Sequence, residues 1–248
     1  MDDVEFDYNQ IPPGYYDLVT KKGNGVQRFW HLYKFDFVIK QLKKDHEKKG
    51  SPFHIVDLGC GPGTFLGLLS KASPIVGVGV DIANTQIEYA NLTYGSDTLR
   101  FKCTSLEDQS LVEDIQTADA VSLIEVIEHM HLPKIREILS NLHQHMKVGS
   151  KLVITTPNYL SYWPILEHII NYVSEVNYEE QHVSKFNRIR LASFLAGCGF
   201  QNVEVRSFLH CSPFVSGLLH QSVGSVMGLM EKKWITHGGP LLWAQATR

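Results

Sequence analysis

The stretch Val-Asp-Leu-Gly-Cys-Gly-Pro-Gly at residues 56–63 decides the fold. A short apolar run at 53–56 leads into it, and residues 64–71, which carry apolar side chains on one helical face, follow it. The order is therefore strand, tight turn and helix. Glycines let the backbone turn sharply and let a ligand approach the main chain closely. In an open parallel sheet, such a turn lies at the strand edge where ligands bind.

The same alternation of strand and helix continues outward from this turn, with no internal repeat and no linker long enough to separate two domains. Apolar runs without polar alternation predict parallel strands that are covered by helices on both faces. Strands are expected at 53–56, 75–80, 99–103, 118–124 and 151–155, followed by a final, antiparallel pair at 203–209 and 241–247. Helices are expected at 25–48, 64–71, 84–92, 132–146, 159–173 and 188–196.

Composition and charge exclude several classes of protein. The 248 residues contain 23 Lys and Arg against 26 Asp and Glu, and a net charge of -3 disfavours a general nucleic-acid binder. Four scattered cysteines form no CxxC pair, which disfavours a zinc knuckle or a disulfide framework and favours a reducing cytoplasm. The acidic N-terminus does not resemble a signal peptide. The uncharged stretch 207–230 contains many polar residues, so we expect no stable membrane insertion, with interfacial contact by residues 214–230 as the minor alternative.

Asp81 is the acidic partner of the glycine turn. It closes the predicted second strand, twenty positions beyond Gly61, at the usual offset for a carboxylate that binds ribose hydroxyls. Thr64 occupies the position of the third glycine of a dinucleotide fingerprint, and Pro62 removes a backbone donor that a phosphate would use. The pattern predicts a nucleoside ligand without a pyrophosphate. Alternatively, Asp81 caps the helix that follows.

Three segments together resemble the class I S-adenosylmethionine-dependent methyltransferases: VDLGCGPG at 56–63, VGVD at 78–81 and DAVSLIEVIEH at 119–129. The resemblance covers about residues 52–210 and implies a Rossmann-like, doubly wound, seven-stranded, mostly parallel sheet flanked by helices. It implies a methyltransferase domain at 52–248, preceded by an N-terminal helical segment at 1–51. That segment and an aromatic helical insertion at about 159–187 would form a cap over the site.

The resemblance also assigns the cofactor contacts. The glycines border the methionine moiety of S-adenosyl-L-methionine, Asp57 positions its amino group, Asp81 binds the ribose and Ile82 contacts the adenine. Where the family often has an acid at the adenine amino group, this chain has Thr104 and Ser105, whose hydroxyls are the expected replacement. The residues implied as cofactor-binding are Asp57, Gly59, Gly61, Gly63, Asp81, Ile82, Thr104, Ser105 and Glu125.

Glu125, Glu128 and His129 follow the buried run AVSLI, at the same sheet edge. In a helical turn their spacing of i, i+3 and i+4 would bring them onto one face. Carboxylates with imidazoles suit Mg²⁺, Mn²⁺ or Zn²⁺, and His182 in the segment EEQHVSKF offers a fourth ligand. Alternatively, Glu128, His129 and His182 act without a metal, with a histidine as general base or as a contact for the acceptor.

This arrangement resembles two families within the superfamily. One comprises the small-RNA 3′-terminal 2′-O-methyltransferases, whose metal ligands are two Glu and two His, and the other comprises the ubiquinone-biosynthesis O-methyltransferases. The leading interpretation is O-methylation of a small-molecule or lipid-like hydroxyl acceptor. The alternative is methylation of an RNA end, for which the candidate cations are Lys21, Lys22, Arg28, Lys185, Arg188 and Arg190. A non-catalytic cofactor-binding protein is the third interpretation.

Overall fold

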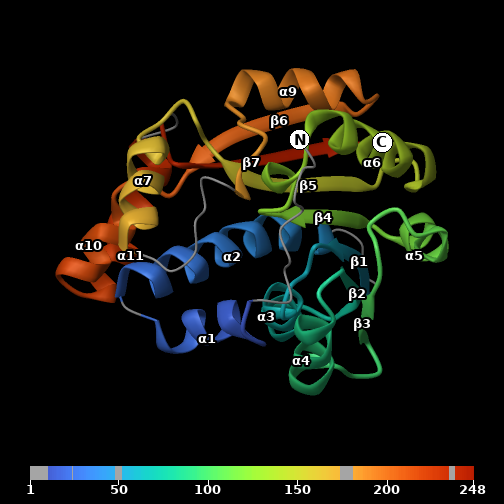
Figure 1. Ribbon diagram of the computed structural model, residues 1–248, viewed down its shortest axis with the longest axis horizontal. Helices are drawn as coiled ribbons and strands as arrows, with labels where there is room; N and C mark the ends of the chain where they lie inside the picture. Colours follow the sequence, from blue (N-terminus) through green and yellow to red (C-terminus); the bar gives the residue numbers. More distant parts are fainter. Residues whose placement is uncertain (1–10, 24, 48–51, 174–180, 235–237) are drawn as a thin grey trace.

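The computed structural model describes residues 11–23, 25–47, 52–173, 181–234 and 238–248. Its centre is a seven-stranded sheet with the strand order β3-β2-β1-β4-β5-β7-β6 (Figure 1). Strands β1 to β5 run parallel, and β7 pairs antiparallel with both β5 and β6. This confirms the predicted doubly wound fold and its antiparallel final pair. The strands are β1 Phe53–Leu58, β2 Ile75–Asp81, β3 Leu99–Cys103, β4 Ala120–Ile124, β5 Lys151–Pro157, β6 Gln201–Phe208 and β7 Leu241–Thr247.

Helices cover both faces of the sheet (Figure 1). The α-helices are α1 Tyr15–Lys22, α2 Gly25–His46, α3 Thr64–Ala72, α4 Asn84–Tyr94, α5 Val112–Thr117, α6 Leu132–His145, α7 Trp163–Val173, α9 Arg188–Gly197, α10 Ser212–Leu218 and α11 Gln221–Trp234. Two short 3-10 helices are η2 Gln109–Leu111 and η3 Ile127–His129. Among the described residues, no helix combines the length and the apolar character needed to cross a membrane.

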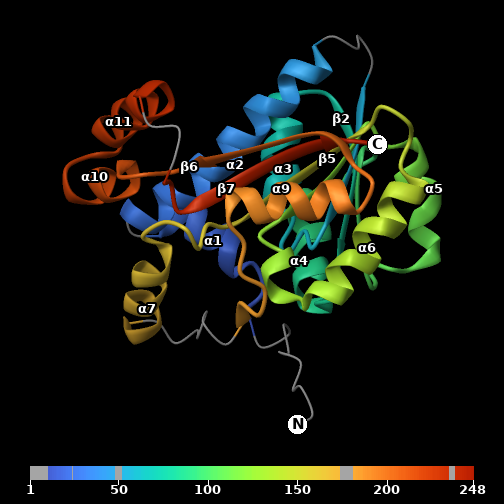
Figure 2. The same ribbon diagram turned by 90° about the horizontal axis from the view of Figure 1, so that it is seen from above.

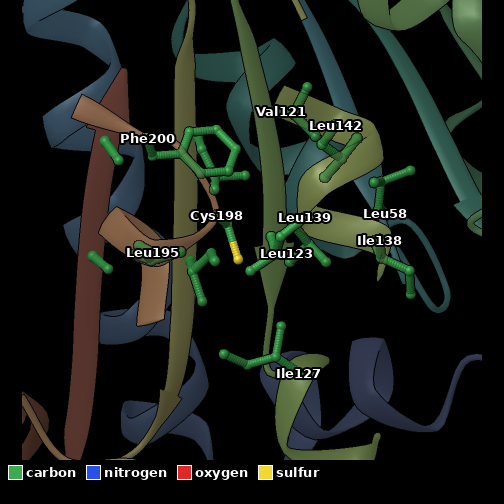
Figure 3. Close-up of a cluster of buried hydrophobic side chains, with 14 of the residues drawn as sticks. Leu58, Val121, Leu123, Ile127, Ile138, Leu139, Leu142, Leu195, Cys198 and Phe200 are labelled. Carbon is green, nitrogen blue, oxygen red and sulfur yellow. The ribbon is translucent and has the colours of Figure 1, made fainter. Parts of the chain in front are cut away.

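Successive strand residues point to opposite faces, so each strand contributes to two hydrophobic cores. In β5, Leu152 and Ile154 pack with α5, α6 and α9, whereas Val153 packs with α2, α3 and α4. Figure 3 shows the first of these cores, where side chains of α6 and α9 gather against Leu123 of β4. Burial on both faces explains why these strands have no polar alternation in the sequence.

The strand order reverses direction between β1 and β4, which are neighbours although two strands intervene in the sequence. The β1–α3 turn and the β4–η3 turn therefore leave the sheet side by side at its carboxyl edge. An open α/β sheet forms its ligand crevice at such a point.

The N-terminal helix α1 docks beside this crevice through one buried carboxylate. Asp17 has no exposed surface, and its carboxylate accepts hydrogen bonds from Tyr89 at 2.6 Å, Tyr94 at 2.5 Å, Thr64 at 3.2 Å and Lys21 at 2.6 Å. Burial favours the neutral acid, but these donors outweigh it and lower the pKa of Asp17. Helix α1 is thus tied to α3 and α4, the helices that follow β1 and β2.

Helices α7, α10 and α11 gather at one end of the molecule (Figures 1 and 2). Trp163 of α7 packs against Trp30 of α2, with ring centroids 5.6 Å apart, so the aromatic insertion contacts the N-terminal segment. The stretch 214–230, for which interfacial contact was the minor alternative, lies in the pair α10 and α11. Residues 174–180 of the predicted cap lie outside the described residues, and the division at residue 51 stays a prediction.

Candidate active site

The turn between β1 and α3 depends on its glycines for two different reasons. Gly59 and Gly63 have φ angles of 73° and 74°, and a Cβ on them would lie 2.5 Å from Val126 and 2.7 Å from Phe101. Backbone conformation and packing therefore both require glycine there. Gly61, at φ 50°, differs, because a Cβ built on it meets no atom of the described residues within 4 Å. Space for a ligand thus opens directly over Gly61.

Asp81 at the end of β2 borders the same space. Its Oδ2 accepts a hydrogen bond from the Gly61 amide at 2.8 Å, and its Oδ1 accepts one from the Ala83 amide at 2.9 Å. Burial raises the pKa of Asp81 despite these donors. Ile82 follows with 49% of its surface exposed. A fixed carboxylate, an exposed apolar side chain and the open glycine form a cradle that fits a nucleoside.

Asp57, near the end of β1, lies deeper than Asp81. It is 2% exposed, and its Oδ1 accepts a hydrogen bond from the Ser122 hydroxyl at 2.6 Å. Burial, helped by the neighbouring charge of Asp81, raises the pKa of Asp57 to about 7, although the Ser122 bond opposes the shift. A carboxylate poised to ionise in this position suits a cationic amino group on a ligand.

We expect Asp57→Asn to stabilise the ligand-free protein at pH 8, with a smaller gain at pH 5 and none below about pH 4. The folded-state pKa of about 7 exceeds the ordinary value of 3.8 for an aspartate, so the wild-type protein loses stability as the pH rises between these values. Asparagine removes that cost and keeps an acceptor for Ser122. Thermal unfolding should show a Tm higher by about 5 °C at pH 8. An equal Tm for both proteins at pH 8 would contradict a raised pKa for Asp57 in the folded protein.

The loop after β3 holds the two residues expected at the adenine. The Thr104 hydroxyl donates to Asp108 Oδ2 at 2.5 Å, and the Ser105 hydroxyl accepts from the Glu107 amide at 3.2 Å. The bond from Thr104, joined by donors from Ser110, lowers the pKa of Asp108 to about 2. These contacts order the loop at the carboxyl edge, and the adenine contact of Thr104 or Ser105 stays a prediction.

Three chemically reactive residues converge beyond β4. One ligand atom each of Glu128, His129 and His182 lies within 4.8 Å of the other two. Glu128 and His129 belong to η3, and His182 comes from the segment before α9. Glu128 is 1% exposed and His182 is 5% exposed. We call these three residues the Glu–His–His centre.

Hydrogen bonds from outside the centre orient all three side chains. Thr156 of β5 donates to Glu128 Oε2 at 3.0 Å. The Nδ1 atom of His182 lies 2.5 Å from Glu167 Oε1, and the Nδ1 atom of His129 lies 3.2 Å from the Gln181 carbonyl oxygen. A carboxylate or a carbonyl behind each imidazole is the usual support of a metal-ligating histidine.

The donor set of the centre fits a divalent cation. Glu128 Oε1 is buried and has no hydrogen-bond partner among the described residues, and such an atom is costly unless a ligand satisfies it. Burial, with the charge of His182, lowers the pKa of His129 to about 4, so its imidazole is neutral, as metal ligation requires. Burial raises the pKa of Glu128 to about 7 in the absence of a cation.

Glu125, the fourth ligand predicted from the sequence, lies elsewhere. The expected helical turn does not begin at this residue, because Glu125 has a φ of 56° and the helical turn starts at Ile127. The i, i+3 and i+4 relation therefore fails for Glu125. Its Oε2 instead accepts from the Lys34 ammonium at 2.5 Å. The structure thus brings together three of the four predicted ligands.

Two further residues beside the site, Lys34 and Glu167, were not expected from the sequence. Lys34 lies in the predicted helix at 25–48 but is only 3% exposed, and a lysine within an apolar stretch was the available signal. Glu167, 4% exposed, supports His182 together with the Tyr159 hydroxyl, which donates to Glu167 at 2.8 Å. Nothing in the sequence relates Glu167 to His182, since that pairing depends on how α7 packs.

Comparisons with known proteins agree with this geometry. Residues 27–205 match a family described as a methyltransferase domain. A ubiquinone biosynthesis O-methyltransferase of Coxiella burnetii is 28% identical over 120 residues, which are 48% of this chain and 49% of that protein. The chain thus matches about half the length of this curated relative.

Solved structures resemble the chain over more of its length. A SAM-dependent methyltransferase from Archaeoglobus fulgidus superposes with a TM-score of 0.61 at 21% identity, covering 98% of this chain and 100% of that one. A SAM-dependent methyltransferase from Thermotoga maritima, described as a possible histamine N-methyltransferase, gives a TM-score of 0.63 at 18% identity and covers 94% and 93%. At these identities the likeness concerns the fold.

Proposed function

The chain belongs to the methyltransferase domain family, and on this premise we propose that it transfers the methyl group of S-adenosylmethionine to a hydroxyl oxygen of a small-molecule acceptor. We propose further that a divalent cation assists the transfer. The observation that supports oxygen methylation most strongly is the Glu–His–His centre, which lies at the carboxyl edge of β4 beside the glycine turn.

On this proposal, the β1 and β2 turns hold the cofactor. Gly61 leaves room for it, Asp81 accepts hydrogen bonds from the ribose hydroxyls, and Ile82 contacts the adenine. Asp57 accepts from the amino group of the methionine moiety, at the bottom of the same crevice. When bound, the cofactor supplies an electrophilic methyl group, so the protein mainly has to align the acceptor oxygen with it.

The Glu–His–His centre would hold the cation through Glu128, His129 and His182, with Glu167 and the Gln181 carbonyl oxygen orienting the two imidazoles. Bound there, Mg²⁺, Mn²⁺ or Zn²⁺ would lower the pKa of an acceptor hydroxyl. Three converging and individually supported ligand groups favour this role over that of a lone general base. Glu128 and Thr156 would remain hydrogen-bonded to each other throughout.

The test is a methyl-transfer assay with purified protein, S-adenosylmethionine and a panel of catechols and phenols, with matched anilines as nitrogen acceptors. We expect methyl ethers as products and a rate that falls by at least about tenfold on chelation and recovers with added cation. Methylation of the anilines alone would contradict oxygen transfer. Ether formation that is insensitive to chelation would contradict cation assistance.

A further inference from the structure

Two shallow, adjoining surface grooves, with volumes of about 500 Å³ and 400 Å³, lie next to the segment that carries His182. They share Arg190 of α9 in their walls. Arg136 of α6 lines the first groove, and Lys185 lines the second. Figures 1 and 2 both show α6 and α9 as neighbours on the same face of the sheet. We call the two together the basic groove.

One wall of the basic groove is formed by the chain segment after His182, which is hydrogen-bonded to η3 and to Met130. The Ser184 amide donates to the Glu128 carbonyl oxygen at 3.1 Å, and the Ser184 hydroxyl donates to the Met130 carbonyl oxygen at 2.6 Å. Lys185 therefore follows His182 by three residues along a strip of chain that is bonded to η3. The second groove therefore begins at the residues that directly follow His182 in the chain.

The three cations of the groove are ordered, and none of them is neutralised by a carboxylate among the described residues. The Arg136 guanidinium lies 4.7 Å from the Phe194 ring centroid, and Arg190 lies 5.6 Å from that of Phe186. Arg190 also donates to the Lys185 carbonyl oxygen at 2.6 Å. In the described part of the chain, none of these three cations pairs with a carboxylate, and no acidic side chain lines either groove.

Large apolar side chains line the same grooves. Leu160 and Ile189 in the first groove are 72% and 75% exposed, and Val183 in the second is 43% exposed. Exposed aliphatic groups interleaved with ordered cations match a ligand that has both an anionic group and an apolar body. A bare inorganic ion would leave these apolar groups uncovered.

We propose that the acceptor is a phosphate ester with an apolar or aromatic body, whose phosphate binds Arg136, Lys185 and Arg190 while its hydroxyl reaches the Glu–His–His centre. This inference rests on the proposed function and adds the chemical class of the acceptor. Guanidinium forks match the tetrahedral oxygens of phosphate, and two arginines with a lysine suit its double charge. Lys21, Lys22 and Arg28 lie on α1 and α2 and do not line the groove, so the structure favours a small phosphate ester over an RNA strand.

The test is calorimetric titration of metal-free protein with phenyl phosphate, phenol, inorganic phosphate and a short oligoribonucleotide. We expect phenyl phosphate to bind at least about tenfold more tightly than phenol or inorganic phosphate. The double variant Arg136→Gln with Arg190→Gln should weaken phenyl phosphate binding by at least about tenfold, since each charged hydrogen bond contributes to affinity. Arg188→Gln is the matched control, because Arg188 starts the same helix but does not line the grooves.

The outcomes separate failure of the phosphate site from failure of the proposed methyl transfer. Phenyl phosphate that fails to bind, or binds equally to wild type and double variant, overturns the phosphate site. S-adenosylhomocysteine should bind wild type and variants with the same affinity. If wild-type protein does not bind S-adenosylhomocysteine, the proposed function is overturned, whereas the result for phenyl phosphate still stands. An oligonucleotide that binds at least tenfold more tightly than phenyl phosphate, with the same loss in the double variant, would overturn the small-ester assignment in favour of an RNA end.

Discussion

Glu128→Gln is expected to lower the methyl-transfer rate by about 10³-fold while the affinity for S-adenosylhomocysteine changes less than twofold. The Glu128 carboxylate is 1% exposed and presents a buried oxygen without a partner to the centre. Glutamine keeps the size of the side chain and an acceptor for Thr156, but it removes the charge that a cation needs. Stopped or quenched assays with saturating acceptor, together with calorimetry for the cofactor product, measure both quantities.

Two further variants make this expectation specific. Glu167→Gln weakens only the support behind His182, so we expect a loss of about 10- to 100-fold in metal affinity or activity. Glu137→Gln removes an exposed carboxylate on α6 and should behave like the wild type. Full activity of Glu128→Gln would contradict both the cation-holding role and any direct role of Glu128 toward the acceptor.

Asp81→Ala is expected to weaken S-adenosylhomocysteine binding by about 100-fold, because on the proposed function it removes the carboxylate that accepts two hydrogen bonds from the ribose hydroxyls. Gly61→Ala should have an effect of similar size for a different reason. Its Cβ would project into the open space over the turn, where no described atom lies within 4 Å, and would occupy the volume that the ligand needs.

Gly149→Ala is the matched control for Gly61→Ala. Gly149 also has a positive φ, of 80°, and open space around its Cβ position, but it lies in the turn before β5, at the opposite end of the strand from the site. Both glycine variants should lose a similar, small amount of thermal stability, and only Gly61→Ala should lose the ligand. Unchanged affinity in Asp81→Ala would remove the ribose assignment.

Local patterns predicted most of the fold because local physics decides it. The three glycines at 59, 61 and 63 require a sharp turn, and uninterrupted apolar runs require burial on both faces of a sheet. Asp81 and the glycine turn are correctly expected side by side, because neighbouring parallel strands end at one edge. The hydrogen bond from the Gly61 amide to Asp81 joins the two residues that stand twenty positions apart in the sequence.

The parts that the sequence did not predict depend on non-local packing or on one backbone angle. Glu125 separates from Glu128 because a single residue adopts φ 56°, which a regular helical spacing excludes. Its partner Lys34 is 91 positions away in the sequence. Glu167 meets His182 only because α7 packs beside the segment that carries His182. Lys185 and Arg190 were among the cations expected from the sequence, but Arg136 joins them only because α6 and α9 pack together.

The proposed function requires one crevice to hold both S-adenosylmethionine and a divalent cation. The most direct measurement is calorimetric titration of the purified protein with S-adenosylhomocysteine, before and after chelation, with the metal content of the same sample determined by mass spectrometry. We predict cofactor binding together with one equivalent of bound Mg²⁺, Mn²⁺ or Zn²⁺ that Glu128→Gln and His182→Ala lose. Absence of S-adenosylhomocysteine binding, or a metal content near zero after incubation with each of these ions, would contradict the account.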